Sequence, residues 1–330
     1  MDDPTMNPPT TATQPFDKII NFRDVGTYIN TVTNQNLLKP GLLFRSARPD
    51  AATPSDRDRL LHTFHLKTII DLRTNTELTE ARRVFTHQQQ TNPSTPAANP
   101  TDLKHPYRIP GLVYKPVDLN GKPYSAALLK HLSWPQTSKL ISLYALGYRK
   151  QAIAILGTQV MAPRGLAGLA EDSLEHCTAE VKQFFDVLSE EASYPVLVHC
   201  TQGKDRTGLV VLLAEMLVGC VPVEAMERDY RLSERQLEPE REAKLGEIRG
   251  MGLPDSFADC PAEWVGRVRG WVEGKGGVEK YLEGCGVGRE QQGVVKGLLL
   301  AGGGRCEVGI GALSIVPCLR AMPRVQAGCE

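Results

Sequence analysis

The stretch that decides the fold is Pro195-Val-Leu-Val-His-Cys-Thr-Gln-Gly-Lys-Asp-Arg-Thr-Gly208, in a chain of 330 residues. Residues 195–198 form a short apolar run rich in β-branched side chains, which is typical of a buried strand. Residues 199–206 are polar and predict a compact loop, and residues 209–218 are apolar without proline and predict a helix. A strand, a loop and a helix start in this order direct several backbone N–H groups towards one point, as in an anion-binding site.

Cys200 is the candidate nucleophile of this loop. A thiol has an ordinary pKa of about 8.5, which falls to about 3.5–7.5 beside a helix N-terminus and cationic neighbours. The predicted helix start, Lys204 and Arg206 give Cys200 such surroundings, so we expect a thiolate able to accept a phosphoryl group. The planar fork of Arg206 suits two oxygens of a phosphate, a geometry that an ammonium group does not reproduce.

The other loop residues have supporting roles in this hypothesis. We expect the amides of residues 201–206 to bind phosphate and Gly203 to adopt a positive φ where the loop turns. The hydroxyl of Thr207 is expected to hydrogen-bond the sulfur and help it to leave, and His199 is expected to support the loop from behind. The phosphate-binding set is therefore Thr201, Gln202, Gly203, Lys204, Arg206 and Thr207. A buried structural cysteine is the alternative, but the complete motif between strand and helix argues against it.

The motif resembles the signature of the cysteine-dependent protein tyrosine and dual-specificity phosphatases. Its Gly203-Lys-Asp-Arg-Thr207 form is similar to one branch, the atypical tyrosine and lipid phosphatases of bacteria and fungi. The further stretches that match this branch are Asn21-Phe-Arg-Asp-Val-Gly26, Leu43-Phe-Arg-Ser46, Ile69-Ile-Asp-Leu-Arg73 with Glu77, and Asp229-Tyr230 followed by Leu232-Ser233. The resemblance runs from about residue 16 to about residue 300 and is weakest between residues 93 and 172. It implies a tyrosine-phosphatase-like fold and phosphoester hydrolysis through a phosphocysteine, without metal or other cofactor.

The chain in order predicts an α/β fold with a central, mostly parallel sheet of four to five strands flanked by helices. The predicted strands are residues 19–23, 42–45, 67–72, 113–117 and 195–198. Thr53 as N-cap, Pro54 and Asp56 predict a helix between the second and third strands, and this order implies a parallel βαβ unit. A second cap, Asp172, is expected to begin a helix whose apolar positions run to residue 188. Arg73 and Glu77 are expected to pair with each other at helical spacing, as scaffold.

The domain organisation follows from composition. Residues 1–15 predict a disordered leader, residues 16–300 one catalytic domain, and residues 301–330 a disordered, glycine-rich tail. Within the domain, residues 85–105 predict a low-complexity loop. Residues 122–170 predict a helical insertion, interrupted at Trp134-Pro135, where a lid over the substrate would lie.

Charge and apolar patterning limit the partners. The 38 basic and 38 acidic side chains balance, so no global field attracts the chain to nucleic acid or membrane. No apolar segment follows Met1, and residues 209–221 are too short for a stable membrane insertion and contain Glu215. We therefore expect a soluble cytoplasmic protein, with no basic amphipathic helix for binding lipid. The eight cysteines form no Cys-x-x-Cys pair and predict no metal site. The oligomeric state stays open.

Hydrolysis of a phosphoester also needs a proton donor for the leaving oxygen. Trp134-Pro135-Gln136 resembles the acid-bearing lid of common tyrosine phosphatases, but a neutral Gln cannot donate that proton. Three carboxylates remain. Asp205 lies in the loop, where it is also a suitable helix N-cap. Asp71 ends a neighbouring strand and Asp118 follows the next one, so both are alternative general acids.

Within this hydrolase class the substrate stays open. A phosphotyrosine protein is the first expectation, with phosphoserine or phosphothreonine as further protein substrates. A phosphoinositide or inositol phosphate is the alternative, because Lys204 adds a cation to the loop. More distant alternatives are a rhodanese-like sulfur transferase and a non-catalytic phosphate-binding adaptor.

Overall fold

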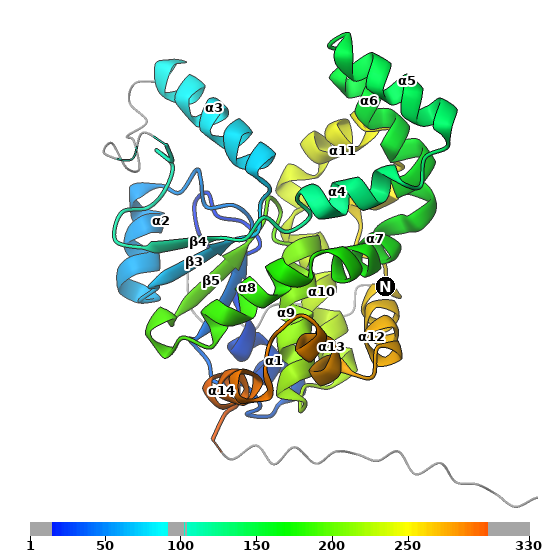
Figure 1. The fold of residues 1–330 in the computed structure, drawn as a ribbon. Helices are drawn as coiled ribbons and strands as arrows, with labels where there is room; N and C mark the ends of the chain where they lie inside the picture. The colour runs from blue at the N-terminus through cyan, green and yellow to red at the C-terminus, as the bar shows by residue number, and fades with distance from the viewer. Residues whose placement is uncertain (1–14, 92–101, 103, 303–330) are drawn as a thin grey trace, which may run out of the picture.

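The computed structural model describes residues 15–91, 102 and 104–302 and has a five-stranded sheet at its centre (Figure 1). The strands are β1 (Arg23–Asp24), β2 (Leu43–Ser46), β3 (Thr68–Asp71), β4 (Val113–Pro116) and β5 (Val196–His199). Their order is β1-β2-β5-β3-β4, and only the short β1 runs antiparallel to its neighbour. The α/β class with a mostly parallel sheet is therefore confirmed.

The centre of the sheet is fully buried. Every residue of β2, β3 and β5 is buried, as expected for strands covered on both faces. The two strands of the predicted βαβ unit, β2 and β3, are parallel to each other. They are not adjacent, because β5, which comes later in the chain, lies between them in the sheet. Ser46, His199 and Asp71 are in register at the carboxyl ends of these strands. The loop after β5 therefore begins at the middle of the edge where ligands bind in such sheets.

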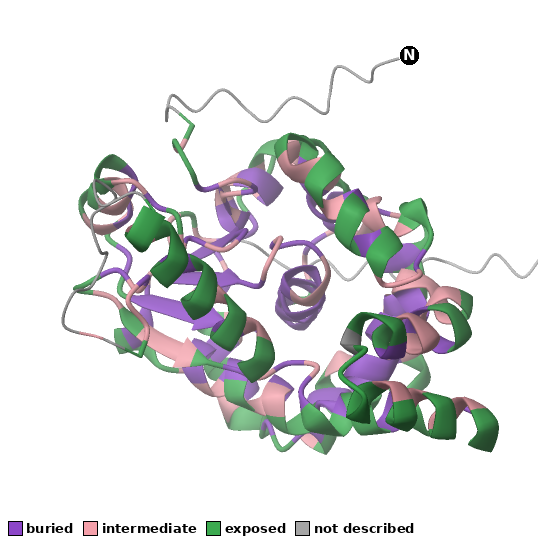
Figure 2. Cartoon of the chain, turned by 90° about the horizontal axis from the view of Figure 1, so that it is seen from above, coloured by how far each residue is buried: buried purple, intermediate pink, exposed green. Residues whose placement is uncertain are grey.

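One helix passes through the core directly after that loop. α9 (Asp205–Val218) is buried from Thr207 to Val218 and packs against α7 (Ala162–His176), α10 (Val223–Gln236), α13 (Val278–Gly284) and α14 (Arg289–Leu299). In Figure 2 the central strands β2, β3 and β5 and the central helix are purple, whereas the surrounding helices are green on their outer faces. The remaining helices after this point are α11 (Arg241–Gly250) and α12 (Trp264–Gly274).

The first half of the chain contains both confirmed and missed helices. Thr53 and Asp56 form the predicted capping box of α2 (Pro54–Asp58), which continues as a π-helical turn over Arg59–Thr63. α1 (Val25–Thr33) was not predicted; it connects the paired strands β1 and β2 along the chain and packs against α10. α3 (Asn75–Thr91) includes residues 85–91, which the sequence placed in a loop. The rest of that loop, the leader and residues 303–330 lie outside the described residues, apart from residues 15, 102, 104 and 105.

The predicted helical insertion consists of α4 (Lys122–Leu129), α5 (Trp134–Ala145) and α6 (Arg149–Leu156), followed by a π-helical turn (Gly157–Met161) and α7. Ser133 and Gln136 form a capping box where the sequence predicted a break. The prediction for Asp172 is wrong, since it lies inside α7 and pairs with Arg164. The chain bends at Cys177 before α8 (Thr178–Leu188).

Candidate active site

The loop between β5 and α9 encloses the Cys200 sulfur. Cys200 is buried, and its Sγ accepts a hydrogen bond from the Gly203 amide at 3.2 Å. Gly203 has a φ of +67°, and a Cβ at this position would lie 2.0 Å from the Ser46 carbonyl oxygen. Only glycine fits both conditions, so the predicted positive φ is confirmed and the loop lies directly against β2.

Three carbonyl groups of the loop, those of Thr201, Gln202 and Gly203, accept hydrogen bonds from residues outside the loop. Thr201 O accepts from the Arg48 amide at 3.1 Å, and the carbonyls of Gln202 and Gly203 accept from Asn21 Nδ2 at 2.9 and 3.1 Å. Arg45 Nη2 also donates to Gly203 O, at 2.8 Å. The amides of the loop have different partners, and that of Gly203 donates to the Cys200 sulfur. Those of residues 201, 202 and 204–206 have no acceptor in the part of the chain that the structure describes, and they are available to an anion.

A buried ion cluster holds this outer side in place. Asp229 on α10 accepts from Arg23 Nε at 2.6 Å and from Arg45 Nη1, and all three side chains are buried. Burial alone would raise the pKa of Asp229, but the two guanidinium groups lower it below its usual value. Arg23 Nη1 also donates to Asn21 Oδ1 at 2.6 Å. The cluster therefore connects β1, β2 and α10 to the carbonyl side of the loop.

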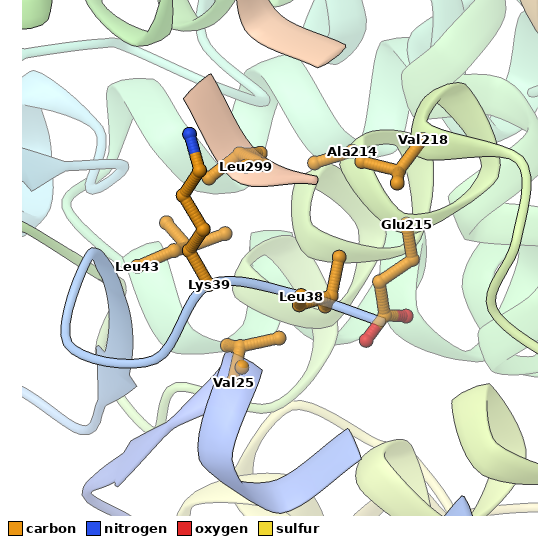
Figure 3. Close-up of a pocket in the computed structure, with 9 residues that line it drawn as sticks. Val25, Leu38, Lys39, Leu43, Ala214, Glu215, Val218 and Leu299 are labelled. Atoms are coloured by element: carbon orange, nitrogen blue, oxygen red, sulfur yellow. The ribbon is translucent and has the colours of Figure 1, made fainter. Parts of the chain in front are cut away.

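Glu215 lies beside this cluster, but its pKa is shifted in the opposite direction from that of Asp229. Its carboxyl is buried on α9, and its Oε1 has no hydrogen-bond partner among the described residues. Burial raises the pKa of Glu215 well above its usual value, and the charge of Asp229 adds to the effect. Figure 3 shows Glu215 among the apolar side chains of a cavity of about 10 Å³, which includes Val25, Leu38 and Leu299. This cavity contains no residue of the Cys200 loop.

Arg206 is oriented by Glu77. Its Nη1 and Nη2 donate to the two oxygens of Glu77, each at 2.6 Å, and Nη1 also donates to Leu72 O at 3.2 Å. Thr201 Oγ1 donates to the same carboxylate at 2.6 Å. Burial would raise the pKa of Glu77, but the hydrogen bonds and charge of Arg206 hold it far below its usual range. A guanidinium has five N–H groups, so Nε–H and one Nη2–H, which lie on one edge, remain for a phosphate.

The expected pair between Arg73 and Glu77 is wrong. Arg73 donates instead to Asp71, with Nη2 at 2.8 Å, and to Asp50, with Nη2 at 3.0 Å. The ring of His199 faces the same Asp71, with Nε2 at 3.6 Å from Oδ2, and burial lowers the pKa of His199. Burial alone would raise the pKa of Asp71, but His199 and Arg73 lower it overall. Asp71 is thus a buried, ionised partner of Arg73, and this state disfavours it as a proton donor.

The other two candidate acids are more accessible. Asp205 is the first residue of α9, and its side chain is 44% exposed. The Tyr230 hydroxyl lies 3.5 Å from Asp205 Oδ1. Asp118 is half-buried after β4 and accepts from Asn75 Nδ2 at 2.7 Å. Both remain candidates for the general acid.

Two side chains of the predicted phosphate-binding set are placed differently from expectation. Lys204 is buried, and its Nζ donates to Phe257 O at 3.0 Å and Asp259 O at 2.7 Å, so its ammonium is not free for a substrate. It also lies 3.6 Å from Asp205 Oδ1. The Thr207 hydroxyl is buried and has no hydrogen-bond partner in the described part of the chain, so its expected contact with the sulfur is not formed. Lys204 retains its amide as a donor.

The sequence interpretation gave no role to the residues that support the loop. Glu77 was assigned to the scaffold, and Asn21, Arg45 and Asp229 were noted only as parts of matching stretches. Asn21 and Arg45 contact the Cys200 loop. Glu77 pairs with Arg206, and Asp229 pairs with Arg45. A signal was present in Arg45, a charged residue at the end of an apolar strand, since a charge there requires a buried partner.

Within the described residues, no group of three or more His, Cys, Asp and Glu side chains is arranged to hold a metal ion. The loop amides and the Arg206 guanidinium place N–H donors beside the Cys200 thiol. Chemically, this arrangement suits attack of sulfur on a phosphoryl group whose oxygens are held by N–H donors.

Comparison with known proteins agrees with this geometry. Residues 14–301 match the model of the tyrosine phosphatase family. The chain is also similar to a tyrosine-protein phosphatase of Nostoc commune, with 29% identity over 160 residues. That match covers 43% of this chain and 54% of the cyanobacterial protein, about half its length. The family match spans most of the chain and includes every residue of the site, so this chain belongs to the tyrosine phosphatase family.

Proposed function

We propose that the protein is a phosphomonoester hydrolase that acts through a phosphocysteine on Cys200, with phosphotyrosine in proteins as its first substrate class. The observation that carries the proposal is the two-sided loop, in which the carbonyls are bonded outward and five amides lack acceptors among the described residues. These amides and the Arg206 edge match the oxygens of one phosphoryl group. The start of α9 adds the positive end of a helix dipole beside the sulfur.

The reaction has two steps in this proposal. The Cys200 thiolate attacks phosphorus, an S–P bond forms, and the P–O bond to the leaving group breaks as that oxygen receives a proton. Water then attacks phosphorus, the S–P bond breaks, and inorganic phosphate leaves with the thiolate restored. Arg206 and the loop amides bind the three non-bridging oxygens in both steps, and Glu77 keeps Arg206 in position.

We assign the proton donor to Asp205. Its exposed carboxyl lies at the end of the loop, whereas Asp71 is committed to Arg73. Asp205→Asn is expected to slow alkyl phosphates about 10²–10⁴-fold, because their alkoxides must be protonated as they leave. Aryl phosphates with good leaving groups should be slowed far less. The basic limb of the kcat/KM profile should also flatten.

A uniform loss for all leaving groups, with a lowered melting temperature, would mean that Asp205 serves only as a structural residue at the start of α9. The same comparison of leaving groups would then be made with Asp118→Asn, because Asp118 is the other accessible candidate for the general acid. Equal behaviour of wild type and both variants would contradict acid catalysis from this side of the loop.

The substrate class is tested by turnover of a panel of phosphotyrosine, phosphoserine and phosphothreonine peptides beside phosphoinositides and inositol phosphates. Wild type is expected to prefer phosphotyrosine peptides, and Cys200→Ser should be inactive on every member. The matched control is Cys220→Ser, which replaces a thiol beyond the far end of α9 and should retain activity. Preference for phosphoinositides would move the substrate to the lipid class, and an active Cys200→Ser would contradict the mechanism.

A further inference from the structure

The helical hairpin of α5 and α6 exposes apolar side chains in an unusual concentration. The described residues include ten exposed large hydrophobic side chains, and seven of them lie between residues 129 and 153. Trp134 is 83% exposed, Ile141 60% and Leu146 72%, and α5 has no fully buried residue. In Figure 1 the two helices stand out from the rest of the protein beyond α4 and α7. A patch of this kind marks a surface that another body covers.

The exposed residues follow the helix period. Trp134 and Ile141 are seven residues apart on α5, about two turns, and so lie on one face. Leu140, on another face, packs against the protein core. Leu146 lies at the end of α5 in the turn that leads to α6. Trp134 and Ile141 therefore form an exposed apolar stripe on α5 that is not its packing face, and Leu146 adds a separate exposed apolar side chain at the tip of the hairpin.

The charge of this segment is one-sided. Residues 121–170 contain six Lys and Arg residues and no Asp or Glu, whereas the other residues carry 32 basic and 38 acidic side chains. Lys139 and Lys150, on α5 and α6, are exposed. An exposed apolar stripe with tryptophan, in a segment whose own charged residues are all cations, matches the composition of helices that lie on anionic bilayers.

The hairpin suits lying on a membrane and not crossing one. Residues 150–176 are, in the described part of the chain, one helical stretch long and apolar enough to span a bilayer. However, Gly165 within it has φ 63° and ψ 175°, so the helix is broken, and a spanning helix needs about 20 continuous residues.

We propose that the α5–α6 hairpin docks the protein on an anionic lipid surface. In this arrangement Trp134 and Ile141 on α5 and Leu146 at the tip of the hairpin enter the interface between headgroups and acyl chains. Lys150 on α6 contacts the anionic headgroups, and Lys139, on the side of α5 away from Trp134, adds to the attraction through its charge. The proposal departs from the sequence-based expectation that the chain has no basic amphipathic helix for binding lipid. The proposal goes beyond the hydrolase activity and does not rest on it, since the hairpin residues are separate from the Cys200 loop.

The test is cosedimentation of the full chain with phosphatidylcholine vesicles, with and without phosphatidylserine. Binding is expected only with phosphatidylserine and should weaken as salt rises. The Lys139→Glu/Lys150→Glu variant should bind at least about tenfold more weakly, since each cation near such a surface contributes to binding. Lys67→Glu/Lys280→Glu makes the same charge change at exposed positions elsewhere and should bind as wild type.

A second pair of variants tests the apolar stripe. Ile141→Gln/Leu146→Gln should lose vesicle binding, and Val84→Gln/Val294→Gln, at exposed positions on α3 and α14, should not. Trp134 fluorescence should shift to the blue on binding, and this shift should disappear in Trp134→Phe. Absence of binding to phosphatidylserine vesicles, or equal loss in hairpin and control variants, would overturn the proposal. A change in oligomeric state in place of vesicle binding, measured by light scattering, would make this face a protein interface and also overturn it.

Discussion

The two sides of the Cys200 loop differ in what their polar groups already contact. On the outer side the carbonyls accept hydrogen bonds from Asn21, Arg45 and Arg48. The Asp229 cluster holds Arg45 directly and Asn21 through Arg23. On the inner side, in the described structure, five amides and one edge of Arg206 have no acceptor. The outer side therefore determines the shape of the loop, and the inner side is left for chemistry. Substitutions on the two sides should separate stability from activity.

The largest effect is expected on the outer side, for Asp229→Asn. Removing one partner of a buried charge cluster leaves Arg23 and Arg45 uncompensated, which costs about 3–5 kcal/mol of unfolding free energy. Activity at low temperature should fall only as far as the folded fraction and loop shape fall. Asp255→Asn, which alters an exposed pair with Arg249, is the control and should change stability by less than about 0.5 kcal/mol. Equal denaturation midpoints for the two variants would contradict the role of the cluster.

The inner side is tested by Arg206→Lys. An ammonium cannot bind Glu77 and two phosphate oxygens at once, so kcat/KM should fall about 10²–10³-fold. The melting temperature should change much less than in Asp229→Asn. Arg267→Lys, which alters an exposed pair with Glu171, should leave kcat/KM unchanged. The assignment fails if the Arg206 variant retains activity within a few-fold of wild type.

Glu77→Gln tests the ion pair between Glu77 and Arg206, which links stability to activity. The folded-state pKa of Glu77 is lowered, so its ion pair stabilises the protein above the unfolded value of about 4.3 and is lost as pH falls towards the folded value. The variant should be less stable by about 1.5–3 kcal/mol at neutral pH, and the difference should shrink below about pH 4. Glu80→Gln on the same helix, in an exposed pair with Arg83, should follow wild type at every pH. A difference that stays constant with pH would exclude the ion pair as its cause.

The parts of the site that are local in sequence could be predicted. The apolar residues before Cys200, the glycine in the loop and the proline-free run after it are adjacent, so strand, positive φ and helix follow from neighbours. The same holds for the Thr53 capping box. These features depend on short-range hydrogen bonds and backbone sterics, which the residue types alone specify.

Features that depend on distant residues could not be predicted. Glu77 and Arg206 are 129 positions apart, and spacing alone favoured the nearer Arg73 as partner. Lys204 reaches carbonyls more than 50 residues away, which removes its charge from the substrate side. α1 contains several β-branched residues, and its helix is specified by the Asp24 cap and by burial of Val25 and Ile29 against the core. Tertiary contacts override local preference in each of these cases.

The central claim is that Cys200 accepts the phosphoryl group, and direct observation of the phosphocysteine tests it most sharply. Wild-type protein is mixed with excess aryl phosphate, quenched within the first turnover and digested, and the peptide that contains Cys200 is analysed by mass spectrometry. We predict the added mass of one phosphoryl group on Cys200 and its absence in Cys200→Ser. Turnover with no phosphoryl group on Cys200, or with the group on another residue, would contradict the account.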